Sequence, residues 1–313
     1  MAAYHRGALV VDLWVGAATE RSLFHTWSVV KPVTAAAGLS LVDAHRIDLD
    51  TPLRRIWPEV AAAGKDDLTF AHVLGHRAGL ASIPAPGTVA SLLDRMGTVA
   101  GLAAATPDWV PGTAQGEHAL TYGHLVDEVV RRVDGRSVGR LVHDEISGPQ
   151  GLDLHLGLDP AEQPRVVPTI GITREWWAAR GETPLQRAAF GTGADDDLIN
   201  SAAWRSAEVP AVNGHATARA MAAFWQMHLD GLLSPAMATP AGPIGPDLVV
   251  GDTCRWTLGG ARLDGPDVGM GGLGGGWACA RPSVDLAWAF LTSAIGGHDR
   301  AELVEQALLG CLR

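Results

Sequence analysis

Lysine and tyrosine are scarce in this chain, and long apolar runs are missing from it. Only two lysines and two tyrosines occur among the 313 residues, and the formal net charge is −10. A protein that binds nucleic acid or an anionic membrane surface usually carries an excess of positive charge, which this chain does not have. No apolar run approaches the length that is needed to span a bilayer. We therefore expect no nucleic-acid partner and no membrane association.

Cysteine is also rare, and the first residues carry no secretion signal. Cys254, Cys279 and Cys311 are odd in number, widely spaced and set among apolar residues. This pattern is typical of small core residues in a reducing compartment and not of a disulfide framework or a metal site. Residues 1–8 lack the apolar core and the cleavage site of a secretory signal. We predict a cytoplasmic protein, and nothing in the sequence implies a metal or an organic cofactor.

The composition is that of a globular protein, and its strand and helix patterns are segregated along the chain. Hydrophobic residues make up 47% and charged residues 19%, which is enough for a sizeable core. The middle of the chain, from residue 51 to about 203, shows helical periodicity, for example an apolar face within 125–133. Strand-like runs occur near both ends, and a helix is predicted from about Arg300. The runs lie at 8–15, 21–26, 256–263, 277–281 and 286–292.

One short motif points to chemistry. In Ser28-Val29-Val30-Lys31 a hydroxyl and an amine are three residues apart, which places them on the same face of a helix over 27–41. A partly desolvated lysine can act as a base for a serine nucleophile. The alternative is a helix N-cap formed by Ser28, with Lys31 solvated in the first turn.

Further motifs follow Ser28 in a fixed order. The matching stretches are Phe24–Ala35, Leu41–Pro52, Trp57-Pro58-Glu59, Leu68–Leu80, Trp109-Val110-Pro111-Gly112-Thr113, Thr121-Tyr122-Gly123-His124, Gly148–Leu152 and a glycine-rich stretch near Met270. This succession resembles the superfamily of serine β-lactamases and penicillin-binding proteins, within it the class C β-lactamases and the related family VIII carboxylesterases. The resemblance runs from about Ala8 to the C-terminus.

The resemblance implies an α+β fold of the β-lactamase/transpeptidase type. In this fold an antiparallel sheet is flanked by helices, an all-helical region is inserted between strands, and the active site lies in the cleft between them. We therefore predict a discontinuous sheet domain from residues 1–50 and 204–313 and a mainly helical domain from 51–203.

The resemblance also implies roles for further residues. Tyr122 occupies the tyrosine position of the family's Tyr-x-Asn motif, where the phenol shuttles the proton of the nucleophile together with the lysine. His124 stands where the β-lactamases carry the asparagine that contacts the substrate amide. A half-buried tyrosine bonded to backbone and a solvated or capping histidine are the alternatives for these two positions.

The glycine-rich stretch 268–277 aligns with the family's Lys-Thr-Gly strand opposite the nucleophile. Met270 then replaces the cation that binds a substrate carboxylate, which favours neutral substrates, and Gly271 and Gly272 let the backbone approach the ligand. The N–H groups of Ser28 and Leu273 would form the oxyanion hole. A simple loop and a methionine that fills the core are the alternatives here.

These observations predict a serine-dependent, esterase-like hydrolase that acts on a small neutral ester, thioester or amide through an acyl-Ser28 intermediate. An acyltransferase of the same fold in small-molecule biosynthesis and a non-catalytic binding protein remain as alternatives. Only about seven residues precede the run at 8–15, where the family usually has a helix that covers the sheet. A second copy of the chain is the simplest cover for that face, so we expect self-association, although a shifted loop could serve instead.

Overall fold

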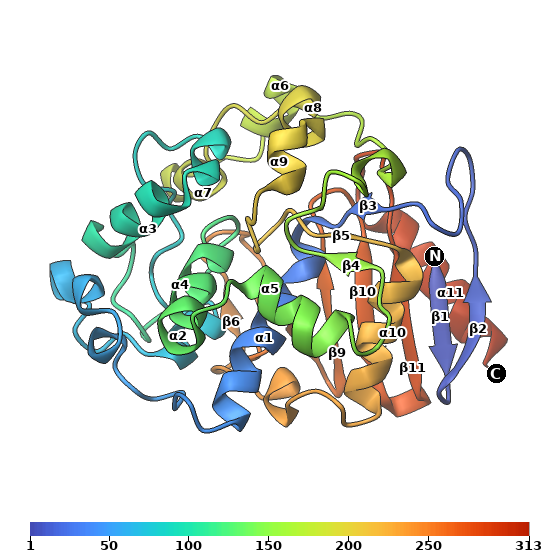
Figure 1. Ribbon diagram of the computed structural model, residues 1–313, viewed down its shortest axis with the longest axis horizontal. Coiled ribbons are helices and arrows are strands. Elements are labelled where there is room, and N and C mark those ends of the chain that lie inside the picture. Colours follow the sequence, from blue (N-terminus) through green and yellow to red (C-terminus); the bar gives the residue numbers. More distant parts are fainter. Residues whose placement is uncertain (313) are drawn as a thin grey trace.

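A six-stranded antiparallel sheet forms one side of the molecule (Figure 1). The computed structural model describes residues 1–312, so Arg313, the last residue of the predicted segment 204–313, lies outside the described residues. The strand order is β2-β1-β11-β10-β9-β8, and every neighbouring pair is antiparallel. The strands are β1 (Ala2–His5), β2 (Ala8–Asp12), β8 (Arg262–Asp264), β9 (Asp267–Gly271), β10 (Trp277–Arg281) and β11 (Leu286–Phe290). The two ends of the chain build this sheet, which confirms the α+β fold.

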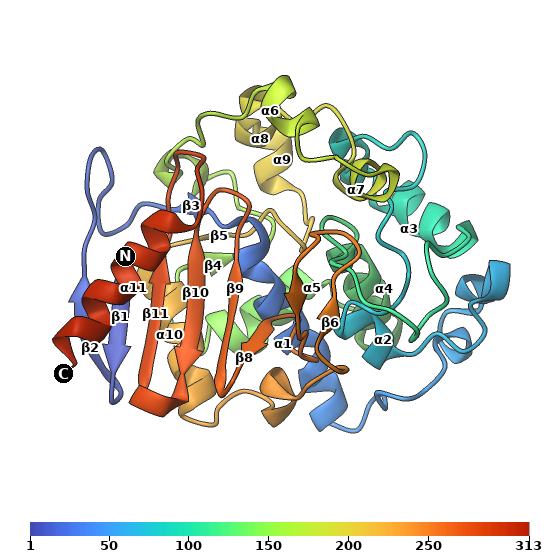
Figure 2. The ribbon, with the colours of Figure 1, turned by 180° about the vertical axis from the view of Figure 1, so that it is seen from behind.

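The two faces of the sheet are covered by different helices. Side chains alternate between the faces along a strand, so Ala278 and Ala289 join the main core while Cys279 and Trp288 face the opposite side. Helix α10 (Ala218–Leu229) packs on the alanine face. Helix α11 (Asp299–Cys311) covers the other face (Figure 2), where its Val304 and Leu308 contact the tryptophan side of the sheet, as the apolar stripe from residue 300 predicts.

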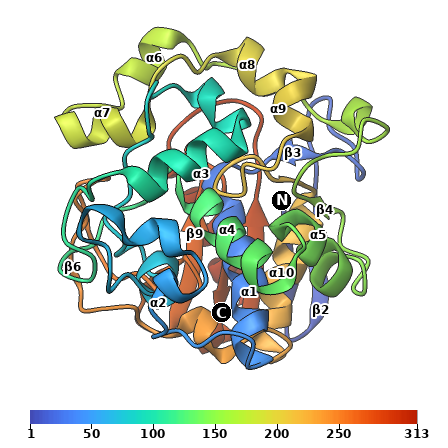
Figure 3. The same ribbon diagram turned by 60° about the vertical axis from the view of Figure 1, so that its left-hand side comes forward.

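Helices from the middle of the chain, together with several short strands, form the region beside this sheet (Figure 3). The helices are α2 (Phe70–Leu74), α3 (Arg95–Ala104), α4 (Tyr122–Asp134), α5 (Val138–Val142), α6 (Arg174–Ala178), α7 (Pro184–Phe190), α8 (Asp196–Asn200) and α9 (Ala202–Ser206). The short strands β3 (Phe24–His25), β4 (Leu154–His155) and β5 (His215–Ala216) form a small sheet, and β6 (Gly245–Pro246) pairs with β7 (Thr253–Cys254). None of the helices within residues 1–312 is both long and apolar enough to cross a membrane.

Helix α1 (Lys31–Asp43) lies between the sheet and the helical region and packs against α4. It begins with Pro32 in its first turn, which is favourable because that position needs no intrahelical N–H donor, and its alanines allow close packing on all sides. The helix predicted over 27–41 is therefore divided, since Trp27–Val30 forms a separate 3₁₀ turn, η1. The break places Ser28 at the junction between the two regions.

One strand lies outside the predicted runs, and one predicted run needs correction. Residues 2–5 form β1, which the sequence did not predict, because the strand is short and is stabilised mainly by pairing with β2 and with β11 at the opposite end of the chain. The predicted strand 256–263 contains only the start of β8. Thr257 instead accommodates a turn, in which its N–H donates to Ala261 O and Gly260 adopts φ +62°. Glycine tolerates that conformation without steric cost.

Apolar side chains are exposed along the edge strand β2 and the residues that follow it. This edge strip consists of Leu9, Val10, Leu13, Trp14 and Val15, of which Val15 is 85% exposed. An edge strand also presents unpaired backbone N–H and C=O groups, so a second copy of the chain can pair with it and cover the apolar side chains.

We propose that the chain self-associates through this edge strip. Light scattering at micromolar concentration is expected to give a mass above that of the monomer, and Val10→Lys is expected to return the mass toward the monomer. Val110→Lys is the matched control, because Val110 is exposed to a similar extent (65%, against 55% for Val10) and does not belong to the edge strip. A monomer mass for the unmodified chain would contradict the proposal.

Candidate active site

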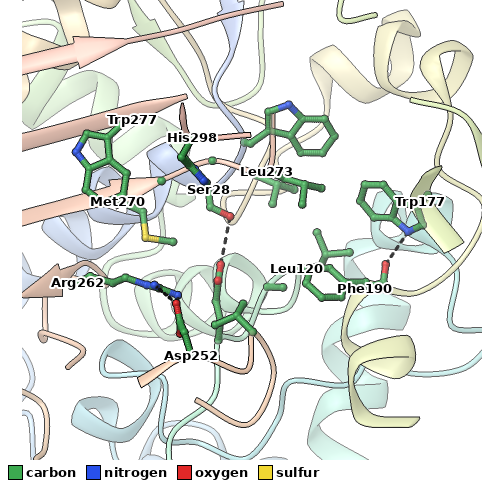
Figure 4. Close-up of a pocket in the computed structure, with 17 residues that line it drawn as sticks. Ser28, Leu120, Trp177, Phe190, Asp252, Arg262, Met270, Leu273, Trp277 and His298 are labelled. Atoms are coloured by element: carbon green, nitrogen blue, oxygen red, sulfur yellow. Dashed lines mark hydrogen bonds and ion pairs between the residues drawn. The ribbon is translucent and has the colours of Figure 1, made fainter. Parts of the chain in front are cut away.

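Ser28 lies at the wall of a cavity of about 280 Å³ that the helical region and the sheet line together (Figure 4). The 3₁₀ turn η1 holds it there, and Trp27, the residue before it, has the left-handed backbone conformation with φ +52°. A tryptophan adopts this conformation only at an energetic cost that the surrounding structure offsets. The strained turn directs the Ser28 side chain into the cavity.

The Lys31 amine contacts the Ser28 hydroxyl directly. Its Nζ atom lies 2.6 Å from Ser28 Oγ and donates to the carbonyl oxygens of Ala119 at 2.9 Å and Ala211 at 3.2 Å. Lys31 is fully buried. Burial lowers the pKa of Lys31, and the neighbouring carboxylate of Glu117 opposes that shift. The structure therefore brings the serine and the lysine together. It does not agree with the alternative, in which Ser28 is a helix N-cap and Lys31 is solvated.

The third side chain at the nucleophile is Glu117, which comes from the loop before α4. Its Oε1 atom lies 3.0 Å from Lys31 Nζ and 3.3 Å from Ser28 Oγ. Ala119, two residues later, also lines the cavity. The tripeptide 117–119 thus holds the place that the resemblance gives to the Tyr-x-Asn motif, with a carboxylate in place of the phenol.

The expected positions of Tyr122 and His124 are therefore corrected. The Tyr122 hydroxyl donates to Leu74 O at 3.3 Å, and His124 Nε2 lies 3.0 Å from Leu92 O. Both side chains are buried on α4, and neither lines the cavity. Within residues 1–312 neither makes a hydrogen bond to Ser28 or Lys31. The Tyr122 hydroxyl is bonded to backbone, as its alternative predicted, but the side chain is fully buried instead of half-buried and its ring stacks on His76. His124 is buried and therefore not solvated.

The glycine-rich stretch lies opposite the nucleophile, as the sequence predicts. Met270, Gly271, Gly272 and Leu273 all line the cavity at the end of β9. A Cβ atom on Gly272 would lie 2.8 Å from Thr26 O, so only glycine allows the backbone to pack this closely against the segment before Ser28. The N–H groups of Ser28 and Leu273 donate to no partner among the described residues. They are free to bind an oxygen atom of a ligand.

The remaining walls of the cavity are partly apolar and partly charged. Trp177 of α6, Phe190 of α7, Leu120 and Val212 form the apolar part, while Arg262, Asp252 and His298 form the polar part (Figure 4). Arg262 Nη1 pairs with Asp252 Oδ2 at 2.5 Å. Burial lowers the pKa of His298, which favours the neutral imidazole. The charged groups that face the cavity are thus arranged in pairs.

Glu117 is the site residue that the sequence analysis missed. A lone carboxylate between Gly116 and His118 forms no recognisable motif, and the tyrosine of the family motif was assigned to the nearest tyrosine, Tyr122. The sequence gives no signal for Glu117, because neither Glu117 nor Ala119 matches the residue types of Tyr-x-Asn. No cluster of three His, Cys, Asp or Glu side chains that could hold a metal ion occurs in the part of the chain that the structure describes.

Comparison with known proteins agrees with this arrangement. The Beta-lactamase family model matches residues 1–311. Among curated proteins, "Esterase/beta-lactamase LipL" of Mycobacterium tuberculosis is 34% identical over 71% of this chain and 56% of its own length. The chain thus spans about half the length of the curated relatives that it matches.

Two solved structures are similar over most of this chain. A penicillin-binding-protein homologue from Caulobacter crescentus has a TM-score of 0.81 and 31% identity, covering 94% of this chain and 86% of that chain. A family VIII carboxylesterase has a TM-score of 0.85 and 29% identity, covering 95% and 86%. With a family model that matches nearly the whole sequence and a Ser-x-x-Lys pair in contact at the cavity, the chain belongs to the beta-lactamase family.

Proposed function

We propose that this chain is a serine-dependent acyl-transfer hydrolase that acts on a small neutral ester, thioester or amide through an acyl-Ser28 intermediate. The observation that carries the proposal is the 2.6 Å contact between Lys31 Nζ and Ser28 Oγ at the wall of an open cavity. A serine hydroxyl needs such a partner because it is a weak nucleophile by itself. The names of the similar esterases support the same reaction class.

The proposed reaction uses Ser28 and Leu273 at the cavity wall and the buried Lys31, which contacts Ser28. Ser28 Oγ attacks the substrate carbonyl carbon, and the Lys31 ammonium group stabilises the negative charge that develops on Oγ. The carbonyl oxygen becomes an oxyanion, which accepts hydrogen bonds from the N–H groups of Ser28 and Leu273. Collapse of this intermediate expels the alcohol, thiol or amine, and water then releases the acyl group from Ser28.

Charge pairing around the cavity favours a neutral substrate. Lys31 pairs with Glu117, Arg262 pairs with Asp252, and Met270 offers no charge to a carboxylate. An anionic substrate would have to compete with Asp252 for Arg262 and would approach the Glu117 carboxylate. The apolar side of the cavity can accommodate an acyl chain or an apolar alcohol group.

Penicillins and cephalosporins, which carry a carboxylate, are therefore expected to be poor substrates. The absence of a charge-assisted hydrogen bond costs about 1.5–3 kcal/mol, which corresponds to roughly 10- to 150-fold in kcat/KM relative to a neutral ester. Hydrolysis of nitrocefin and of p-nitrophenyl butyrate by the same preparation measures the ratio. Equal kcat/KM values would mean that Arg262 leaves Asp252 to bind the carboxylate.

Labelling of Ser28 tests the proposed function itself. Intact-mass analysis after exposure to a fluorophosphonate is expected to show one adduct, and peptide mapping is expected to place it on Ser28. Ser28→Ala should give no adduct and no ester turnover, whereas Ser82→Ala, on a serine outside the cavity, should behave as the unmodified chain. An unlabelled wild-type protein, or a label that persists in Ser28→Ala, would exclude the acyl-Ser28 mechanism.

A further inference from the structure

We propose that Glu117 is the catalytic base of this enzyme, which accepts the Ser28 proton and returns it to the leaving group. The inference rests on the proposed acyl-transfer function and adds a residue that the family motif does not provide. A carboxylate takes the place of the phenol that the Tyr-x-Asn motif would supply.

The donors and acceptors around Lys31 can be counted. Nζ has three acceptors that cannot donate a proton in return, namely the carbonyl oxygens of Ala119 and Ala211 and Oε1 of Glu117. Ser28 Oγ is a fourth acceptor, at 2.6 Å. An ammonium group has three N–H donors and no lone pair, so two of these four acceptors share one N–H, and Nζ cannot accept a proton from Ser28. Burial lowers the pKa of Lys31, but the ion pair with Glu117 opposes that shift and stabilises this charged form.

The Ser28 proton therefore has one acceptor among the described residues. Ser28 Oγ contacts Glu117 Oε1 at 3.3 Å and Lys31 Nζ at 2.6 Å, and these are its side-chain hydrogen-bond partners. With Lys31 as the donor, the hydroxyl hydrogen is directed to Glu117. A contact of 3.3 Å is long for a hydrogen bond between oxygen atoms, but catalytic contacts commonly shorten when substrate is bound.

The loop that carries Glu117 is held by buried polar groups on both sides. Asp247 Oδ1 accepts the N–H of Glu117 at 3.1 Å and those of Val249 and Val250 at 2.9 Å each. Asp247 Oδ2 accepts the indole N–H of Trp256 at 2.8 Å. Asp247 is thus a positioning residue, because it fixes the backbone of Glu117 and of the cavity wall at Val250 through one carboxylate.

Two histidines hold the other side of the same loop. The N–H of His118 donates to His76 Nδ1 at 3.0 Å, and the N–H of Gly116 donates to His76 O at 3.1 Å. His118 Nε2 in turn accepts the N–H of Leu80 at 3.0 Å. The backbone on each side of Glu117 is therefore bonded to fixed partners, which holds the carboxylate in place before substrate binds.

The proposed proton transfers balance over one turnover. As Ser28 Oγ bonds to the carbonyl carbon, its proton moves to Glu117 Oε1, and the carbonyl π electrons become the oxyanion. As the bond from carbon to the leaving group breaks, Glu117 gives that proton to the departing oxygen, sulfur or nitrogen. In deacylation a water molecule attacks the acyl carbon, its proton passes to Glu117, and Glu117 returns it to Ser28 Oγ.

Substitutions at Glu117 test this role. Glu117→Gln keeps the size and an acceptor oxygen but cannot take up a proton, so kcat for p-nitrophenyl butyrate at pH 7.5 should fall at least 30-fold. Glu117→Tyr places a phenol at the same position and should recover part of that activity. In this variant the acid limb of the plot of kcat/KM against pH should move to higher pH, because a phenol ordinarily ionises near pKa 10. Glu182→Gln, at an exposed position, is the matched control and should leave the profile unchanged.

The outcomes separate this inference from the proposed function. A Ser28 adduct in the wild-type protein together with less than a 30-fold loss in Glu117→Gln would mean that Lys31 is the base, and it would overturn the inference alone. If Glu117 has a purely structural role, the Glu117→Gln and Glu117→Tyr variants should lose kcat equally and show no change in the pH profile. This outcome would also overturn the inference. Absence of ester turnover and of any Ser28 adduct in the wild-type protein would instead refute the proposed function.

Discussion

Replacing Lys31 with Met is expected to lower kcat and kcat/KM for a short activated ester together, by about 10²- to 10⁴-fold. Methionine is similar in length but has no charge, so the alkoxide that forms on Ser28 would lose its nearest cation. Both parameters should fall equally because this interaction is made in the transition state and hardly at all with the bound neutral substrate. Steady-state kinetics with p-nitrophenyl butyrate measures the two parameters.

The same substitution should also change the stability of the protein. It leaves the Glu117 carboxylate in a buried position without its cation, which typically costs about 3–5 kcal/mol. Circular dichroism and urea unfolding must therefore accompany the kinetics, so that the activity is compared between folded proteins. Near-normal kcat in a folded Lys31→Met variant would show that Ser28 is activated without the lysine.

Tyr122→Phe provides the contrast, because the structure moves this residue away from the nucleophile. The variant removes one hydrogen bond to the carbonyl oxygen of Leu74, so a loss of about 1 kcal/mol in the free energy of unfolding is expected. Its kcat should stay within a few-fold of the wild-type value. A loss of orders of magnitude without unfolding would restore the role that the sequence assigned to Tyr122.

These contrasts show which parts of the site the sequence could predict. Ser28 and Lys31 were predictable because their proximity depends on local backbone geometry, and a turn followed by a helix preserves it almost as well as one continuous helix. Met270 to Leu273 were predictable because one contiguous glycine-rich segment forms that wall. In both cases the sequence neighbours are also the neighbours in space.

Glu117 could not be predicted in the same way. Which residue of the loop faces Ser28 is decided by distant partners, above all by Asp247, 130 positions away, and by His76. Strand β1 was missed for a similar reason, since Ala2 and Ala3 become part of a strand through pairing with β11 from the other end of the chain. Tertiary partners of this kind are invisible to periodicity and motif spacing.

Five buried histidines suggest a second large effect, on stability in mild acid. His25, His76, His118, His124 and His215 are all at least 95% buried. Burial is the main cause of a lowered pKa in each of them, to about 3 for His118 and His215, to about 4 for His124, and well below the usual value for the other two. The folded protein therefore keeps these side chains neutral at a pH where the unfolded chain protonates them.

The sign of the resulting pH dependence follows from proton linkage. Above pH 6.5 the histidines are neutral in both states and contribute nothing. As the pH falls below 6.5 the unfolded chain gains protons that the folded chain does not take up. Stability is therefore lost progressively until the folded pKa values are reached, which are about 3 for His118 and about 4 for His124. Each histidine should cost about 1.4 kcal/mol at pH 5.5. Asp247 and Glu208, whose pKa values burial raises, act in the opposite direction.

We therefore expect the free energy of unfolding to fall by several kcal/mol between pH 7.5 and pH 5.5, with about four to five protons taken up on unfolding at the lower pH. Since a typical domain is stable by only about 5–15 kcal/mol, this loss should bring the protein close to unfolding. Urea titrations at several pH values measure the slope directly.

Two histidine variants test the origin of the effect. His124→Gln should reduce the proton uptake by about one, and it should preserve the fold because glutamine can retain the single side-chain hydrogen bond of His124, to Leu92 O. His143→Gln, at an exposed position, is the control and should leave the proton uptake unchanged. An uptake of fewer than two protons would mean that most of these imidazoles become protonated within the folded protein. Water would then have to reach a core that is filled by the packing of His25 against Trp27 and Trp204 and of His76 against Tyr122.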